Sequence, residues 1–221
     1  MSGACAVNLK PKVISVRNVA RCAYVLRLER LGLVFRAGQS ITLGLGRMRV
    51  NREYTIYSGE HDEHLEVLIR EVQNGTVSPA LRRCQPGDEL ECAGPYGRFV
   101  IENPEDTSRR YLFVATGTGI APFHAFVRSY PSLNYRLVHG VRLLEERYDM
   151  LDYAAGRYFA CVSRENGGDF HGRVTDFLRL HRTNPQTICY ICGNGRMISE
   201  AYDILRAQGI PSDQIHVEAF F

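Results

Sequence analysis

The stretch Asn51-Arg52-Glu53-Tyr54-Thr55-Ile56-Tyr57-Ser58 is the segment around which the rest of the chain can be arranged. In an extended strand, alternate side chains share a face, so Arg52 and Tyr54 would point one way and Thr55 the other. A guanidinium can bind a phosphate through two hydrogen bonds, and an aromatic ring can stack on a planar group. The octet predicts a ligand-binding strand, although it also fits a surface strand of ordinary β-forming residues.

The composition is that of an ordinary globular protein. The 221 residues suit one large domain or two smaller ones, with 45% hydrophobic and 23% charged residues. A net charge of +3 is too small to indicate nucleic acid as a partner. No apolar run approaches the ~20 residues needed to span a bilayer, and the N-terminus does not resemble a signal peptide. The seven cysteines are typical of reduced thiols, so we expect a cytoplasmic protein without membrane attachment.

The first hundred residues are rich in predicted strands. A helix is expected at Val77–Arg83, where Pro79 lies near the start and the turn Pro86-Gly87-Asp88 follows. Short strands with frequent turns predict a six-stranded antiparallel barrel. The expected strands are Lys12–Arg17, Ala23–Leu28, Ser40–Leu45, Arg52–Ile56, Leu65–Val72 and Glu89–Ala93.

The pattern changes after a polar linker at Glu102–Ser108. Strands and helices then alternate, which predicts a doubly wound parallel sheet. The expected strands are Tyr111–Ala115, Tyr135–Val141, Tyr158–Val162, Thr187–Cys192 and Gln214–Ala219; the expected helices are Ala121–Ser129, Leu144–Tyr153, Val174–Leu180 and Arg196–Gln208.

A glycine-rich segment, Thr116-Gly117-Thr118-Gly119-Ile120-Ala121-Pro122, lies between a predicted strand and a predicted helix. Glycines allow the backbone to approach a pyrophosphate, and a helix start offers free N–H groups and partial positive charge. The third glycine of the usual dinucleotide fingerprint is absent, and Pro122 stands in its place. The segment therefore predicts a dinucleotide loop but also fits a tight strand-to-helix turn.

Arginines follow the next strands where an NAD-binding fold would carry a carboxylate for the ribose 2′-hydroxyl. The segment after the glycines reads Val138-His139-Gly140-Val141-Arg142, and Arg164 and Arg173 follow at later strand or loop ends. Any one of these arginines could be a solvated surface charge. Three of them at consecutive loops favour a ligand with a 2′-phosphate.

With these motifs together, the chain resembles the bacterial ferredoxin/flavodoxin–NADP⁺ reductases, over nearly its whole length from Phe35 onward. The family's Arg-x-Tyr-Ser/Thr motif matches Arg52, Tyr54 and Thr55. The resemblance implies an FAD-binding β-barrel domain at residues 1–101 and an NADP(H)-binding α/β domain at residues 108–221.

The resemblance also implies the residues that contact FAD. Arg52 would bind the flavin pyrophosphate, Tyr54 would pack against the isoalloxazine ring, and Thr55 would lie near its N5 atom. Gly94–Phe99 matches the turn that closes the flavin domain. The other FAD-contacting positions are Glu53, Ile69, Arg70, Gly75, Thr76, Val77 and Ser78.

A second set of residues is implied to bind NADP(H). The pyrophosphate loop would comprise Thr116, Gly117, Thr118, Gly119 and Pro122, and the 2′-phosphate contacts would be Arg142, Ser163, Arg164 and Arg173. Thr55, Cys192 and Glu218 are implied to line the contact where hydride passes. Phe220, followed by Phe221, would stack on the flavin face opposite Tyr54 and gate the entry of nicotinamide.

The chain departs from the family pattern at three positions. Ala37 replaces a proline, Ser40 replaces an aromatic residue, and Gly195 replaces the proline of the Cys-Gly-Asn-Pro signature. The first two departures could loosen the barrel near the flavin. The third could make the loop beside the nicotinamide more mobile.

Cys189 and Cys192 spell Cys-x-x-Cys, which also occurs in redox and metal sites. On a strand, however, these two side chains would face opposite sides, and no second cysteine or histidine pair has matching spacing. We therefore expect no metal site. The plant-type iron–sulfur spacing is absent as well, so any one-electron centre must belong to another protein.

The resemblance therefore implies an enzyme that exchanges hydride between NADP(H) and FAD and single electrons between FAD and ferredoxin or flavodoxin, acting as a monomer. Two alternatives remain open. One is a reductase component that serves an oxygenase or free flavin, and the other is a regulatory subunit that binds flavin or nucleotide without turnover.

Overall fold

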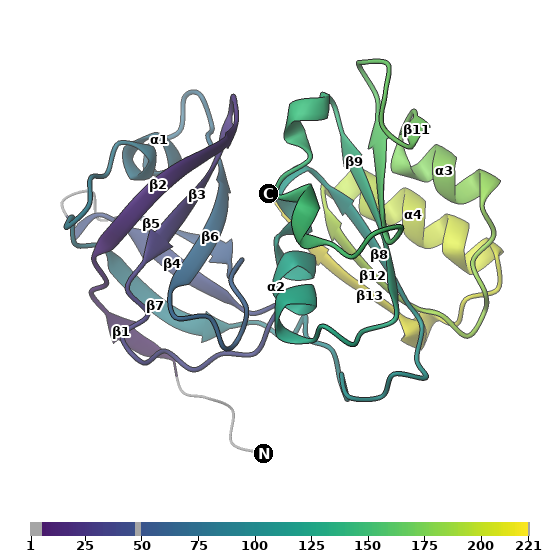
Figure 1. Cartoon of the computed structure of the whole chain (residues 1–221), viewed down its shortest axis with the longest axis horizontal. Helices are drawn as coiled ribbons and strands as arrows, with labels where there is room; N and C mark the ends of the chain where they lie inside the picture. The colour runs from purple at the N-terminus through teal and green to yellow at the C-terminus, as the bar shows by residue number, and fades with distance from the viewer. Residues whose placement is uncertain (1–5, 47–49, 221) are drawn as a thin grey trace. The chain divides into compact units, whose positions relative to one another are not determined.

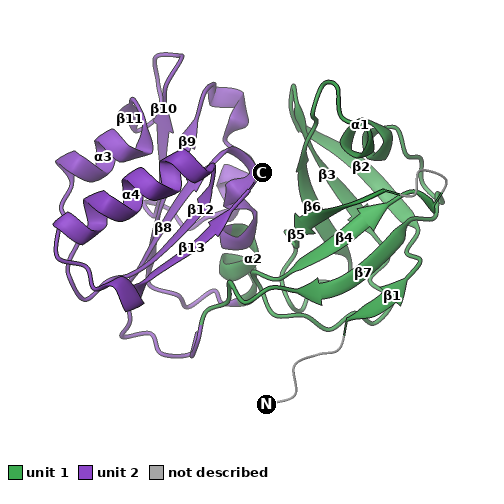
Figure 2. Cartoon of the chain, turned by 180° about the vertical axis from the view of Figure 1, so that it is seen from behind, with its two compact units in different colours: residues 1–101, 124–129 green, residues 102–123, 130–221 purple. Residues whose placement is uncertain are grey.

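The computed structural model describes residues 6–46 and 50–220, and Figure 1 traces the chain from its purple N-terminal strands to its yellow C-terminal ones. The chain packs into two compact units, which Figure 2 colours separately. The first unit contains residues 1–101 and 124–129, and the second contains residues 102–123 and 130–221. Within the described ranges, none of the helices has the length and apolar character that crossing a membrane requires.

The described part of the first unit holds two antiparallel sheets, with strand orders β1-β7-β4-β5 and β2-β3-β6. An isolated bridge between Ile56 and Val67 connects them. This arrangement confirms the expected antiparallel barrel and adds β1, a three-residue strand that the sequence pattern did not predict. The strands are β1 (Val7–Leu9), β2 (Val13–Ala20), β3 (Ala23–Leu28), β4 (Ser40–Gly44), β5 (Asn51–Thr55), β6 (Leu65–Arg70) and β7 (Glu91–Tyr96).

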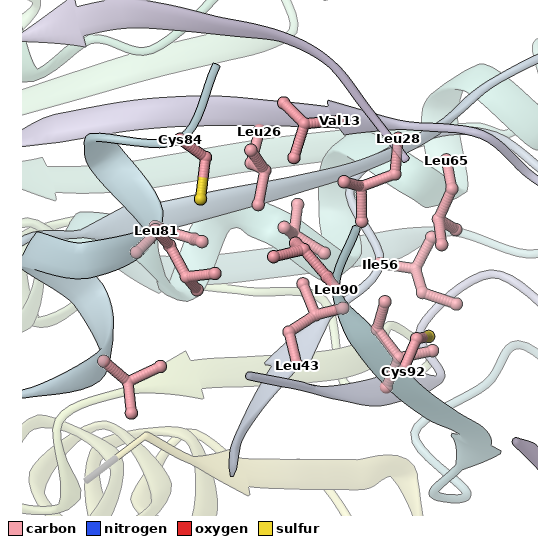
Figure 3. Close-up of a cluster of buried hydrophobic side chains, with 14 of the residues drawn as sticks. Val13, Leu26, Leu28, Leu43, Ile56, Leu65, Leu81, Cys84, Leu90 and Cys92 are labelled. Atoms are coloured by element: carbon pink, nitrogen blue, oxygen red, sulfur yellow. The ribbon is translucent and has the colours of Figure 1, made fainter. Parts of the chain in front are cut away.

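Apolar side chains from both sheets meet inside this unit. Leu26 of β3, Leu43 of β4 and Ile56 are each fully buried in one cluster, and Figure 3 shows them among their neighbours. Burying a leucine or isoleucine side chain stabilises a fold by about 1.5–3 kcal/mol. Since the alternate positions of each strand supply this cluster, the pairing register of the strands is fixed by burial.

The short helix α1 (Val77–Arg82) covers one side of this core. Val77 and Leu81 contribute buried side chains to the cluster, and the Tyr24 hydroxyl donates a 2.6 Å hydrogen bond to the Ser78 carbonyl. The helix and β3 are therefore tied by both apolar packing and a buried polar contact.

The second unit is built on one sheet of parallel strands, in the order β11-β10-β9-β8-β12-β13. Its strands are β8 (Tyr111–Thr116), β9 (Tyr135–Val141), β10 (Tyr158–Val162), β11 (Phe170–His171), β12 (Ile188–Gly193) and β13 (Ile215–Ala219). Its longer helices are α2 (Ala121–Ser129), which continues into the first unit, α3 (Val174–Leu180) and α4 (Gly195–Ala207). The doubly wound parallel sheet is confirmed.

The two faces of this sheet are covered by different helices. Figure 2 shows α3 and α4 side by side over one face, where Leu112 and Val114 of β8 join their apolar cluster. Phe113 points to the other face, where its ring stacks on Phe123 of α2 with centroids 4.8 Å apart. Burial on both faces explains why the strands read as nearly continuous apolar runs.

The helix expected at Leu144–Tyr153 is wrong. The structure has two short 3₁₀ turns, Leu144–Glu146 and Met150–Asp152, and Asp149 between them adopts a left-handed φ of 43°. The Glu146 carboxylate accepts hydrogen bonds from the amides of Arg142 and Leu143, which stabilises a tight turn. Competition from such a side chain disfavours a continuing helix.

The other predicted elements exist, with ends that differ by no more than three residues from those observed. The strand β11 was not predicted. Its two residues, Phe170 and His171, are too few to give an alternating pattern, and they pair with Cys161 and Val162 of β10.

Candidate flavin and nucleotide sites

The strand β5 carries the residues expected to bind flavin. Its partner is β4, with Tyr54 opposite Ile41. Arg52 is exposed, and its guanidinium bonds at 3.1 Å to the carbonyl of Asn51. Tyr54 is half-buried against the core cluster of the first unit, and this burial raises the pKa of its phenol to about 12 although Arg52 opposes the rise. The strand therefore presents an exposed cation beside a neutral, partly buried ring.

Thr55 and Glu53 lie on the other side of β5. Thr55 is buried opposite Ser40 of β4, and the Ser40 hydroxyl donates to the Glu53 carboxylate. The serine that departs from the family pattern thus connects β4 to β5. Glu53 is exposed, and its carboxylate stabilises the strand pair through this bond.

The neighbouring strand β6 ends with the next two expected residues. The Ile69 side chain is 1% exposed and belongs to the core of the barrel, whereas the adjacent Arg70 is exposed. Alternation along the strand explains the difference. Arg70 is thus the residue of this pair whose side chain faces solvent.

Gly75 and Thr76 lie in the turn before α1, and Val77 and Ser78 begin the helix. The Gly75 amide donates to the Val72 carbonyl at 2.8 Å, and the Ser78 hydroxyl accepts from the Val72 amide at 3.0 Å. Val77 is buried, and Thr76 is exposed at the N-cap without a side-chain capping bond. Ser78 therefore closes the turn, and Thr76 is an exposed polar residue beside it.

The glycine-rich segment of the second unit follows β8 as a 3₁₀ turn, Gly117–Ile120, and leads into α2. Gly117 has a φ of +53° and open space where a side chain would begin, whereas a Cβ on Gly119 would lie 2.5 Å from the Cys192 carbonyl oxygen. Pro122 is buried in the first turn of α2, where its missing N–H costs nothing. The half-buried backbone at Gly117, with open space at its Cβ position and a helix start beside it, fits a pyrophosphate.

Thr116 connects this loop to the end of β12. Its hydroxyl accepts a 3.3 Å hydrogen bond from the Asn194 amide, and a Cβ on Gly193 would lie 2.3 Å from the same oxygen. The Asn194 side chain in turn caps α4 by accepting from the Met197 amide at 3.1 Å. Thr116 is therefore a structural contact between two loops as well as part of the expected phosphate loop.

The residues expected near the nicotinamide lie at the end of β12 and on β13. Cys192 and Glu218 are register partners on these two strands, and the Phe220 amide donates a 2.8 Å bond to the Gly193 carbonyl. Glu218 and Phe220 are half-buried. Phe221 lies outside the described residues.

The two cysteines of β12 are buried thiols. Burial raises the pKa of Cys189 to about 12, and burial together with the neighbouring Glu218 carboxylate raises the pKa of Cys192 well above its usual range. A thiol must be deprotonated to act as a nucleophile or a metal ligand. Both residues are therefore neutral packing groups at ordinary pH.

Three expected phosphate-binding arginines follow neighbouring strands at one edge of the sheet. Arg142 comes directly after β9, and the Arg164 amide, two residues after β10, donates a 3.0 Å hydrogen bond to the Arg142 carbonyl. Arg173 follows β11 at the N-cap of α3. All three are exposed, and within the described ranges none of their guanidinium groups forms an ion pair.

Ser163 follows β10 directly and precedes Arg164. Its amide and hydroxyl both donate to the Val141 carbonyl, at 3.1 and 3.2 Å. A hydroxyl bound in this way still has two acceptor lone pairs. Ser163 thus fixes the two strand ends together and keeps an oxygen near the exposed arginines.

The sequence motifs did not single out one buried residue that contacts the glycine-rich loop. His139 of β9 is fully buried, with Nε2 2.9 Å from the Gly117 carbonyl oxygen and Nδ1 2.9 Å from the Tyr158 hydroxyl. Burial lowers the pKa of His139 to about 4, although the Gly117 contact opposes the shift. A histidine inside an otherwise apolar strand run was the available sequence signal.

Comparison with known proteins identifies both units. Residues 6–101 match the family model of the oxidoreductase FAD-binding domain, and residues 113–203 match that of the oxidoreductase NAD-binding domain. The ferredoxin–NADP reductase of Azotobacter vinelandii is 31% identical to the chain over 236 residues, an alignment covering 90% of this chain and 89% of that protein.

Two further proteins extend the comparison. The electron transfer component of toluate 1,2-dioxygenase from Pseudomonas putida is 28% identical, with 94% of this chain and 66% of that protein covered. The structure of a ferredoxin–NADP⁺ reductase from Neisseria gonorrhoeae with bound FAD and NADP superposes with a TM-score of 0.86 at 23% identity, covering 97% of this chain and 99% of that chain.

The two family models show that this chain is an oxidoreductase with an FAD-binding barrel and an NAD(P)-binding parallel sheet. The β5 strand and the glycine-rich loop agree with this assignment. Its identity to a reductase that it matches over most of both lengths places it more closely. The chain belongs to the ferredoxin–NADP reductase family of flavoprotein oxidoreductases.

Proposed function

We propose that this chain is a ferredoxin/flavodoxin–NADP⁺ reductase, which exchanges hydride between NADP(H) and FAD and single electrons between FAD and ferredoxin or flavodoxin. The observation that carries the choice of NADP(H) is the bond between the Arg164 amide and the Arg142 carbonyl, which brings two exposed arginines to adjacent strand ends. A 2′-phosphate carries about two negative charges, and arginine is suited to bind it bidentately.

In this proposal, the domain at residues 1–101 binds FAD and the domain at residues 108–221 binds NADP(H). In the first, Arg52 would bind the flavin pyrophosphate together with Thr76, and Tyr54 would pack on the flavin ring. The exposure of Arg52 and the half-burial of the neutral Tyr54 ring support these roles. The remaining proposed FAD contacts are Glu53, Thr55, Ile69, Arg70, Gly75, Val77 and Ser78.

FAD, when bound, supplies a group that takes two electrons as hydride and releases them singly. The protein supplies position and electrostatics, because hydride transfer requires the reacting atoms about 3–3.5 Å apart. We assign Thr55 to the flavin side and Cys192 and Glu218 to the nicotinamide side. The thiol of Cys192 is buried and stays neutral, so it would help to exclude water from this contact.

The nucleotide would be held at two points of the second unit. Its pyrophosphate would lie at the loop of Thr116, Gly117, Thr118, Gly119 and Pro122, and its 2′-phosphate at Arg142, Ser163, Arg164 and Arg173. We assign Phe220 and Phe221 to covering the flavin in the absence of nicotinamide. The bond from the Phe220 amide to Gly193 gives this part of the chain a fixed attachment to β12.

A reductase component of an oxygenase is the second candidate, and it is favoured by the relative from Pseudomonas putida. The chain spans 66% of that relative's length. A flavin-binding regulatory subunit without turnover is a third possibility.

We further propose that the protein acts as a cytoplasmic monomer. Size-exclusion chromatography would test the monomeric state, and cell fractionation would test the location.

The deciding experiment is an anaerobic titration of the purified holoprotein with NADPH, followed by addition of candidate carriers. Bleaching of the flavin and rapid reduction of ferredoxin or flavodoxin is the expected result. Bleaching without reduction of either carrier, but with electron delivery to an oxygenase or free flavin, would favour the second candidate. If NADPH does not bleach the flavin, the regulatory subunit would be the remaining candidate.

A further inference from the structure

His139 forms a hydrogen bond with the Gly117 carbonyl oxygen in the glycine-rich loop. His139 belongs to β9, and its side chain is fully buried. Nε2 lies 2.9 Å from the Gly117 carbonyl oxygen, and Nδ1 lies 2.9 Å from the Tyr158 hydroxyl. The Tyr148 ring packs against it with centroids 5.9 Å apart. The imidazole thus links the end of β8 to β10.

The partners fix which nitrogen carries the proton. The Gly117 carbonyl can only accept a hydrogen bond, so Nε2 must be the protonated nitrogen. Nδ1 then accepts from the Tyr158 hydroxyl, which remains protonated because burial raises its pKa. Burial also lowers the pKa of His139 to about 4, so the imidazole stays neutral and the direction of both bonds is constant at ordinary pH.

The bond to Gly117 acts together with the 3₁₀ turn Gly117–Ile120 to orient the next amide. A trans peptide is planar, and its C=O and N–H groups point in opposite directions. Since the Gly117 carbonyl is directed at His139, the Thr118 N–H is directed away from it. Gly117 has a φ of +53° and open space where a side chain would begin, and Gly117 and Thr118 are both half-buried.

We propose that His139, held by Tyr158, is a positioning residue for dinucleotide binding, because it turns the Gly117–Thr118 peptide so that the Thr118 amide faces the pyrophosphate. The proposal rests on the proposed function. It differs from the arginine contacts in one measurable respect. The pyrophosphate is common to NADPH and NADH, so loss of the His139 bond weakens both nucleotides equally.

The first test compares His139→Leu with His139→Gln in the FAD-loaded protein, using steady-state kinetics with each nucleotide. Leucine removes the donor, and glutamine keeps an N–H near the position of Nε2. Loss of one hydrogen bond corresponds to ~2–13-fold in affinity. His139→Leu should raise KM for NADPH and NADH by the same factor within this range, with kcat within about twofold, and His139→Gln should restore most of the loss.

The second test is Tyr158→Phe, with Tyr202→Phe on the half-buried face of α4 as the matched control. Tyr158→Phe should raise KM for both nucleotides in the wild-type background and have no further effect in His139→Leu, since the two residues act through one bond. Tyr202→Phe should leave KM unchanged. If His139→Leu cannot be purified with bound FAD, the comparison of KM between Tyr158→Phe and Tyr202→Phe tests the proposal by itself.

Three results would overturn the proposal. They are an unchanged KM in both His139→Leu and Tyr158→Phe, equal damage from leucine and glutamine, and a selective loss of NADPH over NADH. The last would place the effect at the 2′-phosphate. A wild-type protein that oxidises neither nucleotide would instead refute the proposed function, so the two failures are distinguishable.

Discussion

The Arg164 amide donates a 3.0 Å hydrogen bond to the Arg142 carbonyl, so the ends of β9 and β10 place two arginines at adjacent positions. Arg173 follows the next strand, β11, in the same direction. Three exposed cations gathered at consecutive strand ends repel one another. Such a cluster is expected where a polyanion binds, because a phosphate relieves the repulsion.

From this arrangement we expect strong preference for NADPH over NADH. Hydrogen bonds to a charged group contribute ~1.5–3 kcal/mol each, so two such contacts give roughly 10²–10⁴ in relative kcat/KM. Arg164→Ala combined with Arg173→Ala should remove most of this ratio by weakening NADPH while sparing NADH. Arg110→Ala, exposed at the opposite end of β8, is the control. Equal use of both nucleotides by the wild type would contradict the assignment.

Arg52→Ala should reduce the content of bound FAD sharply. Arg52 is the exposed cation of β5, and removing a charged contact to a phosphate costs ~1.5–3 kcal/mol, or roughly 10–100-fold in affinity. The flavin released by heat denaturation should be FAD. Arg83→Ala, at the exposed end of α1, should retain full flavin. Recovery of mostly FMN from the wild type would argue against a pyrophosphate site.

Gly119→Ala should weaken nucleotide binding and lower stability, whereas Gly195→Ala should be tolerated. A Cβ at Gly119 would meet the Cys192 carbonyl oxygen at 2.5 Å, and the surrounding backbone would have to shift. Overpacking of this kind costs ~1–3 kcal/mol. Gly195 opens α4 with nothing near its Cβ position and no positive φ, so alanine should stabilise by up to about 1 kcal/mol. Thermal unfolding and NADP⁺ titration measure both effects, and equal tolerance at the two sites would contradict the close approach.

Phe220→Ala should tighten NADP⁺ binding and slow release of the product. If the ring covers the place that nicotinamide must occupy, displacing it costs ~0.5–1.5 kcal/mol beyond simple burial. A flavin spectrum recorded during NADP⁺ titration should then gain a charge-transfer band. Unchanged affinity and an unchanged spectrum would mean that the half-buried ring serves packing alone.

Much of the fold could be predicted because hydrophobic periodicity reports burial directly. Leu112 and Val114 of β8 alternate with Phe113 between two covered faces, and the resulting apolar run identified a parallel strand. The helix expected at Leu144–Tyr153 failed for a local reason. The Glu146 side chain bonds back to the amides of Arg142 and Leu143, and periodicity carries no information about such a bond.

Short motifs, such as those that contain Arg52 and Gly117, were enough to propose candidate site residues. Contacts between residues that are distant in the sequence could not be predicted. His139 is 22 positions from Gly117 and 19 from Tyr158, so its role depends on the pairing of β9 with β8 and β10. From sequence alone, a histidine in a buried strand has no identifiable partner.

The buried His139 also predicts how stability depends on pH. Its pKa is about 4 in the folded protein and 6.5 in the unfolded chain, where the ring is free to take up a proton. The stability that the neutral ring contributes is therefore complete above pH 6.5 and is lost as the pH falls toward 4. At pH 5 the loss from this residue is about 2 kcal/mol. The groups that face the ring are Tyr158, Tyr148 and the Gly117 carbonyl.

His139→Gln removes the titrating group and keeps a donor toward Gly117. Unfolding of the wild-type and variant holoproteins, followed by circular dichroism between pH 7.5 and 5, should show an extra loss of about 2 kcal/mol in the wild type. The carboxylates common to both proteins cancel in this comparison. Parallel curves for the two proteins would mean that the imidazole takes up its proton without opening the fold, and the assignment of a neutral, fixed ring would then be wrong.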